Sequence, residues 1–234
     1  MDEFEGMTME MLKDTLDWCF KNTNILEAKD KAANGKGLIH FVSEKVYAPL
    51  VKKLLTEGAD LNLKNDSNYT PLHIASEKGH LEVAEMLVDF GNADVNVKDK
   101  NQFTPIYVAS SEGHIDIVEL LLSTGANVNC KHIENWTPLH IAIQEGYLDV
   151  AKMLLQHGAN VNCKSSNELT PLHLSVQIGQ FESSKWLIQN GANLNCKTDI
   201  KETPLILSSL NGHVEITKQL LQNGANLENS DENL

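Results

Sequence analysis

Short apolar stripes at helical spacing recur along the chain, separated by segments rich in Asn, Asp and Gly. Thr70 suits the N-cap of a first helix, and Pro71 suits its first position, where the missing N–H costs nothing. Gly79 ends that helix, and a second stripe of helical spacing follows at Leu81, Val83, Ala84, Leu87 and Val88. The pattern predicts two short helices, of which neither would be stable alone, so that successive pairs must stack.

The phrase Thr-Pro-Leu-His and its variants recur with a fixed period. They begin at Thr70, Thr104, Thr137, Thr170 and Thr203, in steps of 34, 33, 33 and 33 residues. A second phrase, Gly-Ala-Asp/Asn-Val/Leu-Asn, keeps the same register and begins at Gly58, Gly125, Gly158 and Gly191. A glycine at this place can take the left-handed conformation that closes a helix. Two phrases in one register predict a repeat protein whose units pack on their neighbours.

These phrases resemble those of the ankyrin-repeat family, strongly over residues 32–230 and weakly before them. The resemblance implies an all-α solenoid of stacked helix–turn–helix units with projecting β-hairpin loops. It divides the chain into an N-terminal partial or capping repeat, a degenerate repeat without Thr-Pro, and five further repeats, the last with a C-terminal cap: 1–31, 32–64, 65–98, 99–131, 132–164, 165–197 and 198–234. Positions that face a following repeat become polar at Thr217 and Gln219, so we expect a complete array at this end, with residues 229–234 frayed.

The charge of the chain narrows the kind of partner. The formal net charge is -13, and all 19 basic residues are Lys. Nucleic acid needs clustered cations, so neither it nor an anionic membrane is an expected partner. The chain lacks an apolar run of about 18 residues and the basic start of a secretory signal. We therefore expect a monomer inside the cell, in the cytoplasm or nucleus, or one delivered into a host cytoplasm.

Regularly spaced Cys and His residues invite a metal or catalytic interpretation. Cys130, Cys163 and Cys196 occupy one position in three repeats, and stacked helices lie about 8–10 Å apart, too far for a disulfide. The family resemblance implies that the repeated histidines hydrogen-bond the loop backbone and the Thr: His40, His73, His140 and His173. Free thiols fit a reduced, intracellular setting. We therefore expect no catalytic residue, no metal and no cofactor.

The last Asn of the second phrase resembles the hairpin Asn that an oxygen-dependent hydroxylase modifies in some ankyrin arrays. The residues in question are Asn62, Asn96, Asn129, Asn162 and Asn195. The structural alternative is that each side chain satisfies the backbone of the turn.

Positions that vary between repeats are available for binding. The residue before Thr-Pro changes from repeat to repeat and, in the family, lies beside the concave groove: Tyr69, Phe103, Trp136 and Leu169. The inner face of the first helix adds a mildly acidic set: Glu77, Glu112, Gln144, Glu145 and Gln177. Aromatic residues are enriched among interface hot spots. The alternative is that these rings only brace neighbouring hairpins.

The function that follows is a non-enzymatic scaffold that binds a partner protein, one with a basic and apolar segment, in its concave groove. The alternative is a binding module or paralogue of a larger multidomain protein, such as a host-directed effector, whose activity lies elsewhere.

Overall fold

The computed structural model describes residues 37–45, 48–89 and 93–227. The partial repeat expected over residues 1–31 and the frayed end expected over residues 229–234 lie outside these residues. The chain divides into two compact units, Met1–Pro105 (unit 1) and Ile106–Leu234 (unit 2).

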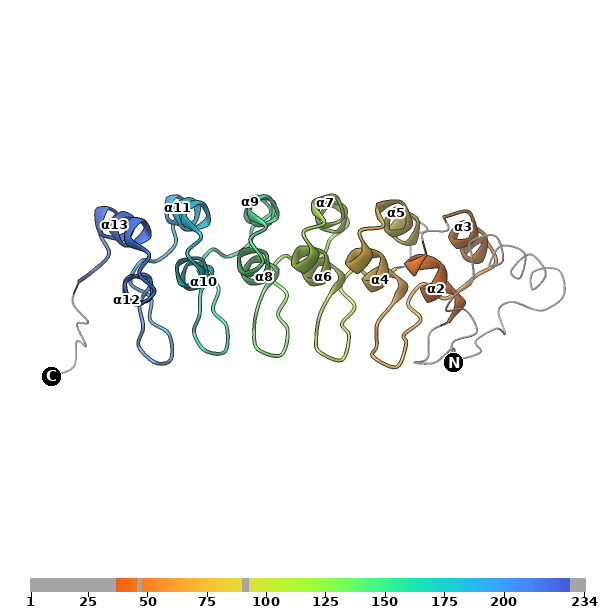
Figure 1. The fold of residues 1–234 in the computed structure, drawn as a ribbon. Coiled ribbons are helices and arrows are strands. Elements are labelled where there is room, and N and C mark those ends of the chain that lie inside the picture. Colours follow the sequence, from red (N-terminus) through yellow and green to blue (C-terminus); the bar gives the residue numbers. More distant parts are fainter. Residues whose placement is uncertain (1–36, 46–47, 90–92, 228–234) are drawn as a thin grey trace. The chain divides into compact units, whose positions relative to one another are not determined.

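Both units consist of short helices in pairs (Figure 1). In unit 1 these are α2 (Leu38–Glu44), α3 (Ala48–Thr56), α4 (Pro71–Lys78) and α5 (Leu81–Asp89). Unit 2 contains α6 (Pro105–Glu112), which begins at the last residue of unit 1, α7 (Ile115–Ser123), α8 (Pro138–Gln144), α9 (Leu148–Gln156), α10 (Pro171–Ile178), α11 (Phe181–Gln189), α12 (Pro204–Leu210) and α13 (Val214–Gln222).

Like helices stack on like helices within each unit. First helices pack together, α2 on α4 in unit 1, and α8 on α10 and α10 on α12 in unit 2. Second helices do the same, α3 on α5, α7 on α9 and α11 on α13. The predicted all-α architecture of stacked helix pairs is confirmed. The described residues contain no strand, and the projecting loops are built from turns (Figure 1).

The first helices begin and end as the sequence predicts. The Oγ1 atoms of Thr70, Thr170 and Thr203 accept hydrogen bonds from the backbone N–H three residues later. Proline follows each threonine at the first helical position. Gly79 caps α4 with φ +74°, in the left-handed region that a residue with a Cβ rarely adopts.

In each unit, leucines at one repeated position form the centre of the core. The members lie at the same position in every second helix and are at most 4% exposed: Leu54, Leu87, Leu121, Leu154, Leu187 and Leu220. Burying a leucine side chain stabilises the fold by about 1.5–3 kcal/mol, and each of these leucines is covered only when repeats are stacked.

The residue before a second helix binds the preceding repeat at three places. Nε2 of His80 hydrogen-bonds the carbonyl oxygen of Glu44 at 3.1 Å, and Nε2 of His213 hydrogen-bonds that of Gln177 at 3.2 Å. Gln180 makes the equivalent bond to Ile143 at 2.9 Å. These carbonyls lie at the ends of first helices, where no intrahelical donor remains, so the neighbouring repeat supplies one.

The outer surface of α12 and α13 is less polar than positions 217 and 219 predict. Thr217 turns its hydroxyl inward, where Oγ1 lies 3.0 Å from Ser208 Oγ and 3.0 Å from the His213 carbonyl oxygen. Leu210 and Val214 remain 72% and 59% exposed on the same helix pair. The assignment of α12 and α13 as a terminal cap stays a prediction.

Candidate partner-binding surface

Each loop presents the residue before Thr-Pro by the same turn. The turn closes with a backbone hydrogen bond from Asn65 to Tyr69, and equivalent bonds join Asp99 to Phe103, His132 to Trp136, Ser165 to Leu169, and Thr198 to Glu202. The first residue of the turn also holds it through its side chain; Asn65 Oδ1, for example, accepts from Ser67 N and Tyr69 N at 2.9 Å. The residue just before the presented one has a positive φ, as at Asn68 with φ 61°. The local backbone thus fixes where each presented side chain starts.

A histidine of the preceding repeat hydrogen-bonds the backbone carbonyl of the presented residue. Nε2 of this histidine lies 3.0–3.3 Å from the carbonyl oxygen of the presented residue in four repeat pairs: His40 to Tyr69, His73 to Phe103, His140 to Leu169, and His173 to Glu202. Nδ1 of the same ring contacts the Thr of its own repeat, at 2.9 Å for His73 and Thr70. The predicted structural role of these histidines is confirmed.

Burial disfavours the charged form of three of these histidines. It lowers the pKa of His140 and of His173 to about 4, and it lowers the pKa of His73 as well. Because the backbone N–H of Thr137 points at His140 Nδ1, that atom accepts and Nε2 carries the proton donated to Leu169. In the repeat of residues 99–131 Tyr107 replaces the histidine, and the Tyr107 and His132 rings meet edge to face at a centroid distance of 5.1 Å.

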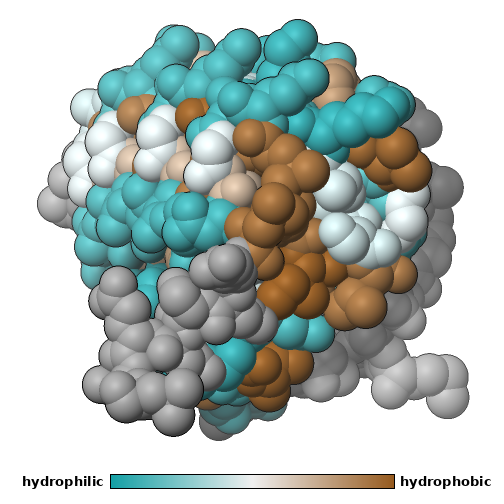
Figure 2. Space-filling model, turned by 90° about the vertical axis from the view of Figure 1, so that its left-hand side faces the viewer, coloured by the Kyte–Doolittle hydropathy of each residue, from teal (hydrophilic) through white to brown (hydrophobic). Residues whose placement is uncertain are grey.

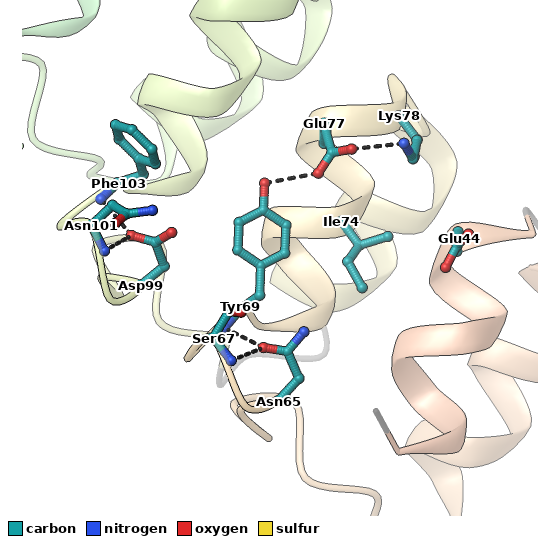
Figure 3. A pocket seen from close by; sticks show the side chains of 10 residues that line it. All are labelled: Glu44, Asn65, Ser67, Tyr69, Ile74, Glu77, Lys78, Asp99, Asn101 and Phe103. Carbon is teal, nitrogen blue, oxygen red and sulfur yellow. Dashed lines mark hydrogen bonds and ion pairs between the residues drawn. The ribbon is translucent and has the colours of Figure 1, made fainter. Parts of the chain in front are cut away.

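In unit 1 the presented residues Tyr69 and Phe103 line a shallow open pocket of about 430 Å³ (Figure 3). The Tyr69 ring stacks on His73 with centroids 4.7 Å apart, and its hydroxyl donates to Glu77 Oε2 at 2.9 Å. Glu77 Oε1 accepts from Lys78 Nζ at 2.7 Å. A presented side chain therefore reaches along the first helix to its last turn. The structure brings together three of the predicted residues here: Tyr69, Phe103 and Glu77.

In unit 2 the half-buried Trp136 lies among histidines. Its ring stacks on His132 at a centroid distance of 6.3 Å and tilts against His140 at 5.8 Å. Leu169 is half-buried, and its carbonyl is bound by the same His140. These contacts support the bracing interpretation of Trp136, while its remaining exposed area leaves room for a partner. The alignment of all four presented residues along one groove stays a prediction.

The ends of the first helices in unit 2 are open to solvent. Glu112, Glu145 and Gln177 are exposed, and Gln144 is half-buried. Taken separately in each unit, these residues and the presented ones make up what we call the variable surface: Tyr69, Glu77, Lys78 and Phe103 in unit 1, and Glu112, Trp136, Gln144, Glu145, Leu169, Gln177, Ile178, Glu202 and Leu210 in unit 2.

Sequence reasoning missed an apolar group at the end of this surface. This group lies around the turn between α10 and α11 and the turn between α12 and α13. Its members are Ile178 (44% exposed), Phe181 (38%), Leu210 (72%) and Val214 (59%). The packing of α10 on α12 and the bond from His213 to Gln177 bring these turns together. Viewed from the end where α12 and α13 lie, hydrophobic residues form a continuous band (Figure 2). The sequence did contain a signal for this group: Leu210 is apolar at the repeat position where the two preceding repeats carry Gln144 and Gln177.

The repeated asparagines connect the turns of successive repeats. Asn129 Oδ1 accepts from Asn160 N at 2.9 Å, and its Nδ2 donates to the Gly158 carbonyl at 3.0 Å. Asn162 bonds the next turn in the same way, and Oδ1 of Asn62 and of Asn195 accepts from Asp94 and Asn226. The backbone satisfied is that of the next repeat, which favours the structural alternative. Hydroxylation of these asparagines stays a prediction.

The repeated cysteines lie behind this surface as free thiols. Cys130, Cys163 and Cys196 are buried, and burial raises the pKa of Cys163 to about 11. Cys163 Sγ lies 3.3 Å from Thr137 Oγ1 and 3.4 Å from His140 Nδ1, so it packs against the Thr–His pair of the preceding repeat. Among the described residues, no group of His, Cys, Asp and Glu could hold a metal ion.

None of the helices in the described part of the chain is long and apolar enough to cross a membrane.

Comparison with known proteins identifies the repeats. The family model for three ankyrin repeats matches residues 38–132 and 158–231, and that for a single ankyrin repeat matches residues 134–166. Among curated proteins, protein phosphatase 1 regulatory subunit 12A from Mus musculus and that from Rattus norvegicus are each 33% identical over 79 residues. The match covers 34% of this chain and 8% of each relative. With family models matching most of its length, the chain belongs to the ankyrin-repeat family.

Proposed function

We propose that the chain is a non-enzymatic scaffold that binds another protein through the variable surface. One observation carries this proposal: at this surface the backbone is held by repeated residues while the side chains change. The histidine of the preceding repeat holds the same carbonyl in four repeat pairs, yet the residues presented there are Tyr69, Phe103, Leu169 and Glu202. Rigid backbone with variable side chains is how a solenoid separates stability from recognition.

The composition of the surface supports a protein partner with basic and apolar groups. In unit 2 the exposed Glu112 and Glu145 supply negative charge, and Ile178 and Leu210 supply exposed apolar area. Contiguous exposed apolar surface commonly marks an interaction site, and opposite charge speeds and orients association. The free buried thiols support an intracellular setting for this binding.

The similarity to a regulatory subunit supports the alternative function. Because the match spans 8% of that protein, a stretch like this one serves there as one part of a much larger chain. On this alternative the chain is the binding module of, or a relative of, a larger protein whose activity lies elsewhere. The variable surface binds the partner in both cases.

The experiment is affinity capture with charge-matched variants, starting from proteins in native cell extract and identifying them by mass spectrometry. Glu112→Lys with Glu145→Lys reverses two charges on the variable surface. Glu119→Lys with Glu182→Lys makes the same change on exposed positions of α7 and α11. We expect the first pair to weaken binding of the captured partner roughly tenfold, or about 1.4 kcal/mol, and the second to leave it unchanged. Equal effects of the two pairs, or none from the first, would refute the proposal.

A further inference from the structure

We infer that the pocket of unit 1 receives an arginine side chain of the partner, an inference that rests on the proposed function. The first step is the charge of the lining. Among the described residues that line the pocket, Glu44, Glu77 and Asp99 contribute three carboxylates and Lys78 contributes one ammonium group. This excess of negative charge lies in a chain whose formal net charge is already -13. The pocket therefore favours a cation over an anionic or neutral group.

The second step is the aromatic wall. Tyr69 and Phe103 both line the pocket, and Ile74, 4% exposed, adds apolar area to it (Figure 3). The Tyr69 ring cannot swing freely because His73 stacks on it and Glu77 accepts from its hydroxyl. A fixed ring beside a carboxylate suits a planar guanidinium, which stacks on aromatic faces and pairs with carboxylates through two N–H groups.

The third step concerns Lys78, which already pairs with the carboxylate that the arginine would bind. Its Nζ lies 2.7 Å from Glu77 Oε1, and its side chain is 45% exposed. An exposed ion pair of this kind contributes little to stability, so an incoming arginine can displace it at small cost. The two side chains therefore act in opposite directions: Glu77 attracts the arginine, and Lys78 competes with it.

The test uses the full chain labelled with ¹⁵N and a short blocked peptide, acetyl-Gly-Arg-Leu-Gly-amide. The control peptide carries citrulline, which has the shape of arginine without its charge. We expect the arginine peptide to shift the backbone amide signals of Tyr69, Glu77 and Phe103. Affinity for the citrulline peptide should be about tenfold lower, which corresponds to about 1.4 kcal/mol.

Three variants test the residues. Glu77→Gln should lower the affinity for the arginine peptide by a similar factor, and Lys78→Gln should raise it. Glu82→Gln, on α5, should leave this affinity unchanged. Equal binding of the two peptides, or equal binding to the Glu77→Gln chain, overturns the inference.

Failure here is distinguishable from failure of the proposed function. If citrulline binds as well as arginine while Glu112→Lys with Glu145→Lys still releases the captured partner, the pocket inference falls and the scaffold function stands. If the pair of charge reversals has no effect, the proposed function falls, whatever the peptides do.

Discussion

Nε2 of His140 lies 3.1 Å from the backbone carbonyl oxygen of Leu169, the residue that the next repeat presents on the variable surface. Nδ1 of the same ring accepts from the Thr137 N–H at 3.2 Å, and this second bond needs a neutral ring. Protonation would place a second ring hydrogen against that donor and a charge in a buried site. The histidine that holds this surface residue is thus favoured in its neutral form by the fold around it.

Stability should therefore fall as the pH is lowered. The pKa of His140 and of His173 is about 4 in the folded chain, below the ordinary value of 6.5. Between these values the unfolded chain binds protons that the folded chain excludes, so stability is complete above about pH 6.5 and declines toward about pH 4. Each histidine contributes up to about 1.4 kcal/mol per pH unit in this window.

Urea unfolding at about pH 7 and about pH 5, followed by circular dichroism, measures this loss. His140→Gln should lower stability at neutral pH and also reduce the loss on acidification, because glutamine takes up no proton. The exposed His157, replaced by Gln, is the control and should keep the full dependence. A His140→Gln chain as pH-sensitive as the unsubstituted chain would argue against the assignment.

Replacing Trp136 by Ala should destabilise unit 2. The ring contacts His132 and His140 and is half-buried, so we expect a loss of about 2 kcal/mol, below the 3–5 kcal/mol typical of a buried tryptophan. If Trp136 is also a binding anchor, the affinity for the captured partner should fall by about 2 kcal/mol or more. Thermal unfolding and binding measured on the same variant separate the two roles. A lower melting temperature with unchanged affinity assigns the ring to bracing, and an unchanged melting temperature excludes bracing.

The repeated cysteines should be unreactive in the native chain. Burial raises the pKa of Cys163 to about 11 and raises that of Cys196, so the thiolate is scarce near neutral pH. A Cys19→Ser chain isolates Cys130, Cys163 and Cys196. Titration with Ellman's reagent should find no rapid reaction in the native protein and three thiols after denaturation without reductant. Fewer than three thiols would indicate a disulfide, which the repeat spacing forbids.

Gly179 should tolerate Ala less well than Gly158 does. Both have φ +87°, so both variants carry the cost of a left-handed residue, about 1–2 kcal/mol. A Cβ at Gly179 would also lie 2.5 Å from the His213 ring, whereas nothing lies within 4 Å at Gly158. Urea unfolding should show Gly179→Ala to be the less stable variant. In a His213→Ala chain the two glycine variants should cost the same; a difference that persists there would mean the ring is not the cause.

The sequence predicted the fold well because residues within each repeat mark where its helices begin and end. Thr70, Pro71 and Gly79 mark the start and end of α4 without reference to any distant residue. Local signals repeated in register specify a stack because each helix pair can bury its apolar stripe only on its neighbours.

The side-chain contacts between neighbouring repeats could not be predicted from the sequence. The period gives the position of Trp136 but not the orientation of its ring between His132 and His140. Likewise the sequence suggested that Asn129 satisfies turn backbone but did not show that the turn is that of the next repeat, because the distance between loops depends on how the helices stack. The exposed apolar group that includes Leu210 could not be predicted for the same reason, because the exposure of a side chain depends on which neighbouring residues cover it.

Amide hydrogen exchange of the chain, alone and with its captured partner, tests the central claim most directly. The claim is that the partner lies on the variable surface and leaves the second helices uncovered. We expect the partner to slow exchange in the turns at residues 144–147 and 177–181 of unit 2, next to Glu145 and Ile178. Slower exchange confined to α7, α9 and α11, with these turns unchanged, would contradict it.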